Sequence, residues 1–228
     1  VHLLKAYGVA RFAETLQRAG FVSLNRSTDK YGLSLVLGGA EVCLCDVVSC
    51  YARMAACYID TTAYAEFPLR DRVALYHTFN AMREVNRPDQ MDWRRATSVQ
   101  NVAWKTGTSY GSRDAWAIGV TPQYVVGVWV GNADGSGVAE LTGARIAGPI
   151  LFDMLNLLSY SEWFAEPCST DGVTLKVCVH SGHLAGRYCT DTKEVLLPRN
   201  SVKSLSCPYC KEFNVSLDGL RLITDRSE

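Results

Sequence analysis

Residues 101–131 read NVAWKTGTSYGSRDAWAIGVTPQYVVGVWVG. Apolar and β-branched residues dominate three runs in and just before this stretch, and they predict strands over residues 99–108, 114–121 and 124–131. The connections between the runs are too short for a crossover, so the strands are expected to pair antiparallel. The sequence therefore predicts an antiparallel meander in the middle of the chain.

The first of these strands ends in a polar group, Lys105-Thr106-Gly107-Thr108. Because side chains alternate along a strand, Lys105 and Gly107 are expected on one face and the two threonines on the other. Gly107 has no side chain, so a substrate or another backbone can approach the strand closely there. A positive charge, two hydroxyls and an open backbone are suited to holding a carboxylate-ended peptide along the strand.

Helical periodicity surrounds the predicted sheet. Apolar residues recur at helical spacing over 2–20, 40–58 and 70–84 before the strands, and over 147–158 after them. We therefore expect an α+β fold in which helices flank an antiparallel sheet. Residues 1–160 are predicted to form this domain. Residues 161–228 are predicted to form a small, cysteine-rich β domain that is incomplete.

The composition excludes some classes of partner. The chain has 228 residues, with 23 Lys and Arg against 23 Asp and Glu. Nucleic acids and anionic membrane surfaces are bound by proteins with a basic excess, so neither is expected as the main partner. No apolar run reaches the roughly 18 residues of a membrane span. The chain shows no signal peptide and no initiator Met, and we expect it to be a piece of a longer protein.

The sequence around the lysine resembles the transpeptidase domain of class A penicillin-binding proteins, the 1C type in particular. The resemblance covers about residues 1–158, and the motif K-T-G is shared with serine β-lactamases. It rests on WKTGTSYG at 104–111, RDAWAIG at 113–119 and VGVWVGN at 126–132, and on shorter blocks at 31–35, 37–41 and 148–150. In the tail, Ser181-Gly182, Cys189 and Cys207-Pro208-Tyr209 resemble the accessory C-terminal domain of these proteins.

The resemblance implies a partial penicillin-binding, β-lactamase-like fold and D,D-transpeptidase chemistry. The substrate would be a peptidoglycan stem peptide, cross-linked through a serine acyl-enzyme that β-lactams also form. No cofactor and no metal are implied at the site. The complete protein would be periplasmic, anchored in the inner membrane by an N-terminal segment, and would also carry a glycosyltransferase domain.

The resemblance also implies roles for individual residues. Lys105 would hold the substrate carboxylate and tune proton transfer, and the backbone N–H of Thr108 would form half of an oxyanion hole. Thr106 and Gly107 would contact the substrate. Trp104 and Tyr110 would line the groove that receives the stem peptide.

The two other family motifs have no convincing counterpart. Ser27-Thr28-Asp29-Lys30 matches S-x-x-K, and Ser23-Leu24-Asn25 matches S-x-N, but the order is reversed and the spacing too short. Ser27 also lies in a turn-rich stretch, whereas a nucleophile activated by a lysine should open a helix. We therefore expect the nucleophile in the missing N-terminal part of the enzyme, and the isolated chain to be inactive. A non-catalytic cell-wall or partner-binding module is the alternative.

The nine cysteines fall into two groups. Cys43, Cys45, Cys50 and Cys57 lie in the apolar segment 38–58 and are expected to be small buried apolar residues. Positions 43, 50 and 57 are seven residues apart, so they are expected on one helix face. The cysteines of the tail are Cys168, Cys178, Cys189, Cys207 and Cys210.

Three explanations remain open for the tail cysteines. Clustered cysteines in a small β domain favour disulfides in an oxidising compartment. A zinc site could combine Cys207 and Cys210 with Cys178, Cys189, His180 or His183. Cys207-Pro208-Tyr209-Cys210 also matches the dithiol of a thiol oxidoreductase, but that motif requires a thioredoxin-like domain around it.

Overall fold

The computed structural model describes residues 1–24, 31–84, 101–159, 162–215 and 222–223. The chain forms two compact units, Val1–Glu166 and Pro167–Glu228. The boundary lies six residues after the position expected from the sequence, because the segment that contains Phe164 packs into the core of the first unit. The two units are described separately below.

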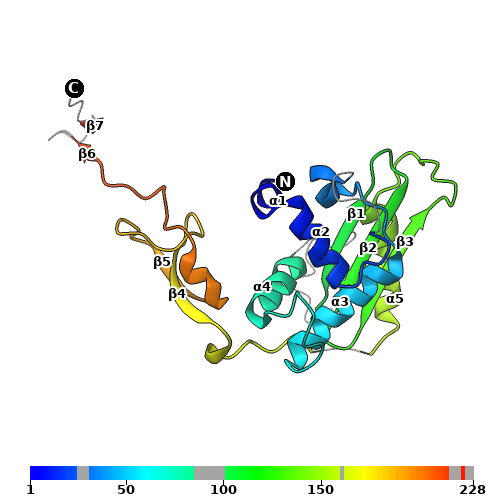
Figure 1. Cartoon of the computed structure of the whole chain (residues 1–228), viewed down its shortest axis with the longest axis horizontal. Helices are drawn as coiled ribbons and strands as arrows, with labels where there is room; N and C mark the ends of the chain where they lie inside the picture. Colours follow the sequence, from blue (N-terminus) through cyan, green and yellow to red (C-terminus); the bar gives the residue numbers. More distant parts are fainter. Residues whose placement is uncertain (25–30, 85–100, 160–161, 216–221, 224–228) are drawn as a thin grey trace. The chain divides into compact units, whose positions relative to one another are not determined.

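A three-stranded antiparallel sheet forms the centre of the first unit (Figure 1). Its strands are β1 (Ala103–Thr108), β2 (Asp114–Val120) and β3 (Val125–Gly131), in the order β1-β2-β3. The register places Lys105 opposite Ile118, and Gly107 opposite Trp116. The predicted meander and the α+β fold class are confirmed. The predicted start of the first strand, at residues 99–100, lies outside the described residues.

The helices of the first unit differ in their bounds from those predicted. The helix expected over 2–20 is divided into α1 (His2–Tyr7) and α2 (Val9–Arg18), because Gly8 adopts a φ of 98° between them. A 3-10 helix, η2 (Gly32–Leu37), follows α2 along the chain.

The cysteine-bearing helix α3 spans Leu44–Ile59 and begins four residues later than predicted. Cys43 is therefore its exposed N-cap, and Cys45 in the first turn is exposed as well, contrary to the expectation for both. Cys50 and Cys57 are buried as expected. Asp71 is the N-cap of helix α4 (Arg72–Arg83), and its side chain accepts a hydrogen bond from Ala74 N at 2.9 Å.

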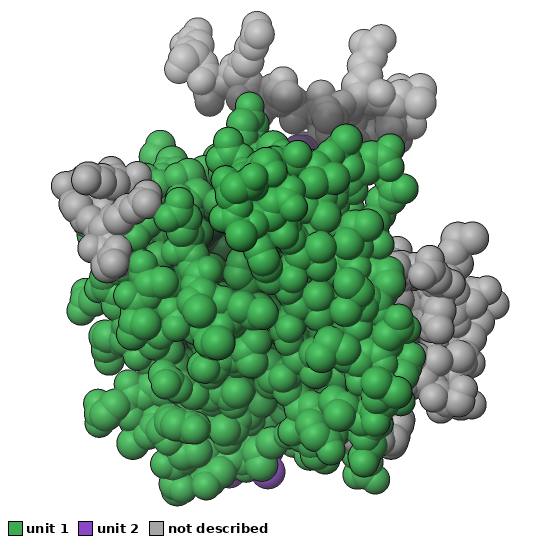
Figure 2. All heavy atoms as spheres, turned by 90° about the vertical axis from the view of Figure 1, so that its right-hand side faces the viewer, with its two compact units in different colours: residues 1–166 green, residues 167–228 purple. Residues whose placement is uncertain are grey.

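Helices cover both faces of the sheet. Buried side chains of α3 and α4, among them Cys50 and Phe79, form one core with Ile118 and Val120. On the other face, a short π-helical turn, η4 (Gly143–Ala147), leads into α5 (Gly148–Asn156). This face contains a second core, with Trp104, Leu151 and Leu155. In the space-filling view of one side, the first unit is a continuous packed body (Figure 2).

The second unit contains little regular structure. Strands β4 (Val173–Cys178) and β5 (Thr192–Leu197) form an antiparallel pair. Two 3-10 helices, η5 (Ser169–Asp171) and η6 (Arg199–Lys203), flank this pair, and β6 (Asn214–Val215) pairs with β7 (Leu222–Ile223). Within the described part of the whole chain, no helix has the length and the apolar character needed to cross a bilayer.

Candidate active site

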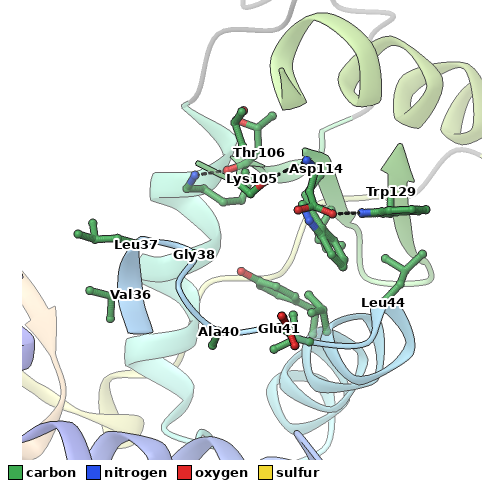
Figure 3. Close-up of a pocket in the computed structure, with 18 residues that line it drawn as sticks. Val36, Leu37, Gly38, Ala40, Glu41, Leu44, Lys105, Thr106, Asp114 and Trp129 are labelled. Carbon is green, nitrogen blue, oxygen red and sulfur yellow. Dashed lines mark hydrogen bonds between the residues drawn. The ribbon is translucent and has the colours of Figure 1, made fainter. Parts of the chain in front are cut away.

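A cavity of about 860 Å³ lies between the sheet and the segment that leads into α3. Figure 3 shows Lys105 and Thr106 on one side of this cavity, and the segment from Val36 to Glu41 on the other. The sheet lines it with Lys105, Thr106, Gly107, Thr108, Ser109, Asp114, Trp116, Ile118 and Trp129. The other wall consists of Val36, Leu37, Gly38, Ala40, Glu41, Val42, Leu44, Val47 and Tyr51.

The alternation of side chains along β1 places its lysine on the cavity face. Lys105 and Gly107 pair with Ile118 and Trp116, and all four residues line the cavity. The exposed ammonium group of Lys105 donates a hydrogen bond to the carbonyl oxygen of Thr106. The cavity therefore has a cationic wall beside a position without a side chain.

β1 lies at an edge of the described sheet. Ser109 N donates to Asp114 O at 3.1 Å, which continues the ladder between β1 and β2. In an antiparallel ladder alternate residues direct their backbone groups to the partner strand, so those of Thr106 and Thr108 point away from β2. The N–H of Thr108 is thus directed to the outer edge of the strand, where a ligand can approach.

The hydroxyl of Thr108 has a structural partner. Its oxygen accepts a hydrogen bond from Gly143 N at 3.0 Å, and this bond joins β1 to η4. The hydroxyl hydrogen is not used in that bond, so the side chain retains a donor for a ligand.

Several residues of the cavity were not singled out from the sequence. Trp129 Nε1 donates to Asp114 Oδ1 at 2.8 Å, and this hydrogen bond joins β3 to β2 at the cavity wall. Glu41 and Tyr51 come from the opposite wall. Burial raises the pKa of the Tyr51 phenol, so this side chain stays neutral at physiological pH. In the sequence, the block at 37–41 resembles the family, but the resemblance implies no role for its residues.

Two of the predicted substrate-binding residues do not line this cavity. Trp104 is only 1% exposed and packs edge-on against Phe152 of α5, 5.1 Å between ring centroids. It points to the face of the sheet opposite Lys105, as the alternation along β1 requires. Tyr110 is 96% exposed in the turn after β1. The structure therefore places Trp104 in the core and Tyr110 in solvent.

One of the two candidate motif serines, Ser23, is not brought to the cavity. Ser23 Oγ donates to Asp46 Oδ2 at 2.7 Å, and Ser23 is not among the lining residues. Its side chain therefore ties the segment before η2 to α3. Ser27, Lys30 and Asn25 lie outside the described residues.

Gly107 of β1 and Gly143 of η4 allow a matched test of how closely η4 packs on the strand. A Cβ on Gly143 would lie 2.5 Å from the carbonyl oxygens of Gly107 and Trp116, whereas a Cβ on Gly107 would meet Trp116 Cβ at an ordinary 3.5 Å. We expect Gly143→Ala to lower the free energy of unfolding by about 1–3 kcal/mol. Gly107→Ala should change it by less than about 1 kcal/mol. Urea unfolding of the chain measures both, and equal losses would contradict this packing.

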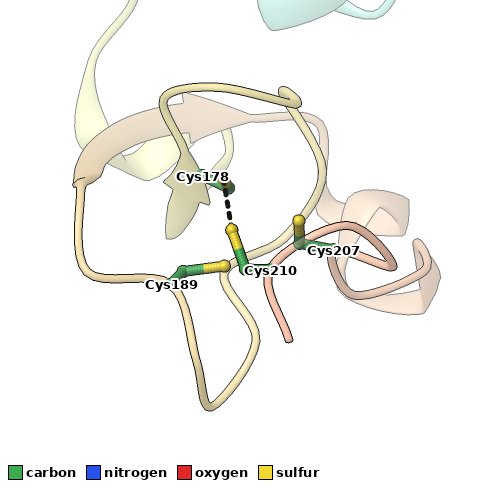
Figure 4. A group of neighbouring side chains, drawn as sticks. All are labelled: Cys178, Cys189, Cys207 and Cys210. Atoms are coloured by element: carbon green, nitrogen blue, oxygen red, sulfur yellow. Dashed lines mark hydrogen bonds between the residues drawn. The ribbon is translucent and has the colours of Figure 1, made fainter. Parts of the chain in front are cut away.

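The second unit contains a group of four cysteines (Figure 4). The sulfur atoms of Cys178, Cys189, Cys207 and Cys210 all lie within 4.8 Å of one another. All nine cysteines of the chain are free thiols in the structure, so the expected disulfides are not observed. A hydrogen bond from Ser181 lowers the pKa of Cys207 to about 6, whereas the side chain of Cys189 raises that of Cys210 to about 12.

The C-P-Y-C sequence lacks the surroundings of a redox motif. A thioredoxin-like dithiol begins a helix after a strand. Cys207 follows the 3-10 helix η6 by a few residues, and the described residues after Cys210 do not begin a helix. Cys207 and Cys210 also share their surroundings with two further thiols. This arrangement does not support a thiol oxidoreductase.

Comparisons with known proteins place the chain in a class. No protein-family model matches it. Penicillin-binding protein 1C of Escherichia coli is 36% identical over 190 residues, which are 80% of this chain and 24% of that protein. Penicillin-binding protein 1A of Aquifex aeolicus is 40% identical over 68 residues, or 29% of this chain and 9% of that protein. The chain thus spans about a quarter of its 1C relative.

The fold agrees with these matches. The crystal structure of penicillin-binding protein 1A from Haemophilus influenzae superposes with a TM-score of 0.57, over 85% of this chain and 37% of that one. Its sequence identity of 17% supports the fold alone. The resemblance to class A penicillin-binding proteins is confirmed, and the chain corresponds to part of a protein of this class. The match to the 1C protein extends over most of the chain.

Proposed function

We propose that this chain belongs to a peptidoglycan D,D-transpeptidase that cross-links stem peptides through a serine acyl-enzyme. Residues 1–166 would be the C-terminal part of the transpeptidase domain, and residues 167–228 a small accessory domain. The observation that carries the proposal is the exposed cation of Lys105 on β1, an edge strand of the described sheet, within a cavity of about 860 Å³. Stem peptides and β-lactams share a carboxylate, which is the group that this cation would bind.

The backbone of β1 suits an extended peptide. A peptide can add to the edge of a sheet through main-chain hydrogen bonds, and β1 is an edge strand of the described sheet. Gly107 leaves the cavity face of the strand free of a side chain, so that a ligand can lie against it. Thr106 and the hydroxyl of Thr108 would contribute contacts from the same strand.

The N–H of Thr108 would stabilise the reaction's transition state. Attack on a carbonyl by a serine places negative charge on the carbonyl oxygen, and a preorganised backbone donor lowers the energy of that charge. The second donor would be the backbone N–H of the serine itself. The ammonium group of Lys105 would hold the substrate carboxylate. It would also assist proton transfer near the serine.

We place the nucleophilic serine in a segment of the enzyme before Val1. Among the described residues that line the cavity, the only serine is Ser109, whose Oγ accepts from Asp114 N at 2.9 Å in the β1–β2 turn. Val36, Leu44 and Val47 give the opposite wall an apolar surface against which such a segment would pack. The complete enzyme would be periplasmic and anchored in the inner membrane by its N-terminal part.

Labelling with a fluorescent penicillin tests whether the nucleophilic serine lies outside residues 1–228. We expect the chain of residues 1–228 to remain unlabelled, because it does not supply the attacking oxygen. A longer protein that includes the segment encoded before Val1 should be labelled in stoichiometric amounts, at a serine of that segment. Labelled peptides are identified by mass spectrometry. Covalent labelling of the isolated chain at Ser27 would overturn the proposal, and so would a longer protein that is not labelled.

A further inference from the structure

The four clustered cysteines come from three separate segments of the second unit. Cys178 is the last residue of β4, Cys189 lies in the loop before β5, and Cys207 and Cys210 form a C-x2-C pair (Figure 4). Residues up to 32 positions apart in the sequence thus bring their sulfur atoms within 4.8 Å of one another. Neither the proposed function nor the relatives' names account for this cluster.

The backbone holds these segments together independently of the thiols. Leu184 forms β-bridges with both Val177 and Ser206. Cys207 N donates to Leu184 O at 2.8 Å, and Cys178 N donates to His183 O at 2.9 Å. The fold therefore preorganises the cysteine side chains around a common centre.

The distances fit a metal ion better than disulfides. Four sulfur atoms about 2.3 Å from a tetrahedral zinc ion are about 3.8 Å apart. The sulfur atoms of Cys178 and Cys210 are separated by 3.7 Å. A disulfide requires about 2.05 Å between two sulfur atoms. Each sulfur also lies near all three others, as in a tetrahedron.

Two of the four sulfur atoms accept hydrogen bonds from groups outside the cluster. Gly186 N donates to Cys189 Sγ at 3.3 Å, and Ser181 Oγ donates to Cys207 Sγ at 3.1 Å. Such donors commonly surround metal-bound ligands, where they fix the orientation of each ligand and spread its negative charge.

The described part of the second unit up to residue 213 has little apolar core. Val177 and Cys178 are the buried side chains among its described residues up to 213. Domains of this size usually depend on a disulfide or a structural metal for stability. A bound ion at this centre would join the end of β4 to the two loops that supply the other ligands.

We propose that Cys178, Cys189, Cys207 and Cys210 bind one zinc ion as a closed tetrathiolate site. The four thiols release their protons when the ion binds, and no oxidant is required. With all four positions taken by protein ligands, the site leaves none for substrate, so the ion has a structural role. The fifth tail cysteine, Cys168, is exposed and is not one of the four.

The test gives disulfides an equal opportunity to form. The complete chain of residues 1–228 is exported to the periplasm of a bacterial host and purified without reductant or chelator. Metal content is measured by plasma mass spectrometry, and bridges by the intact mass after denaturation. We expect about one zinc ion per chain and an intact mass without the loss of two hydrogens for each bridge. Two bridges without metal, or iron in place of zinc, would overturn the proposal.

Two variants and a metal replacement make the assignment specific. Cys210→Ser should lose the zinc, whereas Cys168→Ser, a matched cysteine of the same unit, should retain it. Cobalt exchanged into the wild-type chain should show the intense visible absorption of a tetrahedral thiolate complex. Retention of zinc by Cys210→Ser, or a cobalt spectrum typical of oxygen ligands, would contradict the site. None of these measurements depends on transpeptidase activity, so this proposal and the proposed function can fail separately.

Discussion

Replacing Lys105 by Ala in the longer protein is expected to lower the rate of acylation by a fluorescent penicillin about 100- to 1,000-fold. Lys105 is exposed on the cavity wall and lies on the same face as Gly107. Its loss removes the cation that would bind the carboxylate and assist proton transfer. Because the side chain is exposed, the free energy of unfolding should change by less than about 0.5 kcal/mol.

One further variant separates the charge of Lys105 from its geometry, and another is a control at a different lysine. Lys105→Arg keeps the charge but places it on a larger, planar group, so an intermediate acylation rate is expected. Lys176→Ala removes an exposed lysine from β4 in the second unit and should leave acylation unchanged. Labelling of Lys105→Ala within twofold of the wild type, measured as a time course, would show that this lysine does not bind the carboxylate.

Trp104→Ala is expected to lower the free energy of unfolding of the chain by about 3–5 kcal/mol. The indole is 1% exposed and belongs to the core beneath the sheet, where it contacts Phe152 and lies near Leu151 and Leu155 of α5. Its removal leaves a cavity that these neighbours fill only in part. Urea unfolding followed by far-ultraviolet circular dichroism measures the loss, and Trp104→Phe should lose less.

Tyr110→Ala is the matched control for the tryptophan. Tyr110 follows the same strand but is 96% exposed, so its replacement should change the free energy of unfolding by less than about 0.5 kcal/mol. A loss for Trp104→Ala no greater than that for Tyr110→Ala would place the indole outside the core, contrary to the structure.

The sheet could be predicted from the sequence because its signals are local. The runs before and after Ser109-Tyr110-Gly111-Ser112 are joined by a connection that admits only antiparallel pairing, and the register follows from the turn. The separation of Lys105 from Thr106 onto opposite sides of β1 likewise follows from alternation. These predictions did not require knowledge of what packs against the sheet.

The segments that pack against each face of the sheet could not be predicted in the same way. Alternation puts Trp104 and Lys105 on opposite sides, but the packing of α5 against the tryptophan depends on contacts with residues more than 40 positions away. The opposite wall of the cavity, including Glu41 and Tyr51, comes from a segment more than 50 residues before β1. The helix expected over 2–20 is divided at Gly8, which interrupts an otherwise regular apolar pattern.

The cysteines illustrate the same limit of sequence patterns. Spacing identified Cys207 and Cys210 as a pair, but three kinds of chemistry share that spacing. The bridges of Leu184 to Val177 and Ser206, together with backbone hydrogen bonds such as Cys178 N to His183 O and Val179 N to Asp191 O, bring Cys178 and Cys189 to the pair. Long-range backbone pairing thus determines which thiols meet, and it is not encoded in the interval between two cysteines.

As an edge strand of the described sheet, β1 is also a surface to which a strand of a second copy can add, since outward N–H and C=O groups can pair with another extended chain. A lysine near the middle of such a strand opposes this self-association, because the chain that docks must desolvate the ammonium group or bring a second one beside it. Lys105 is therefore expected to limit such self-association whenever the edge is uncovered, in addition to any part it has in recognition.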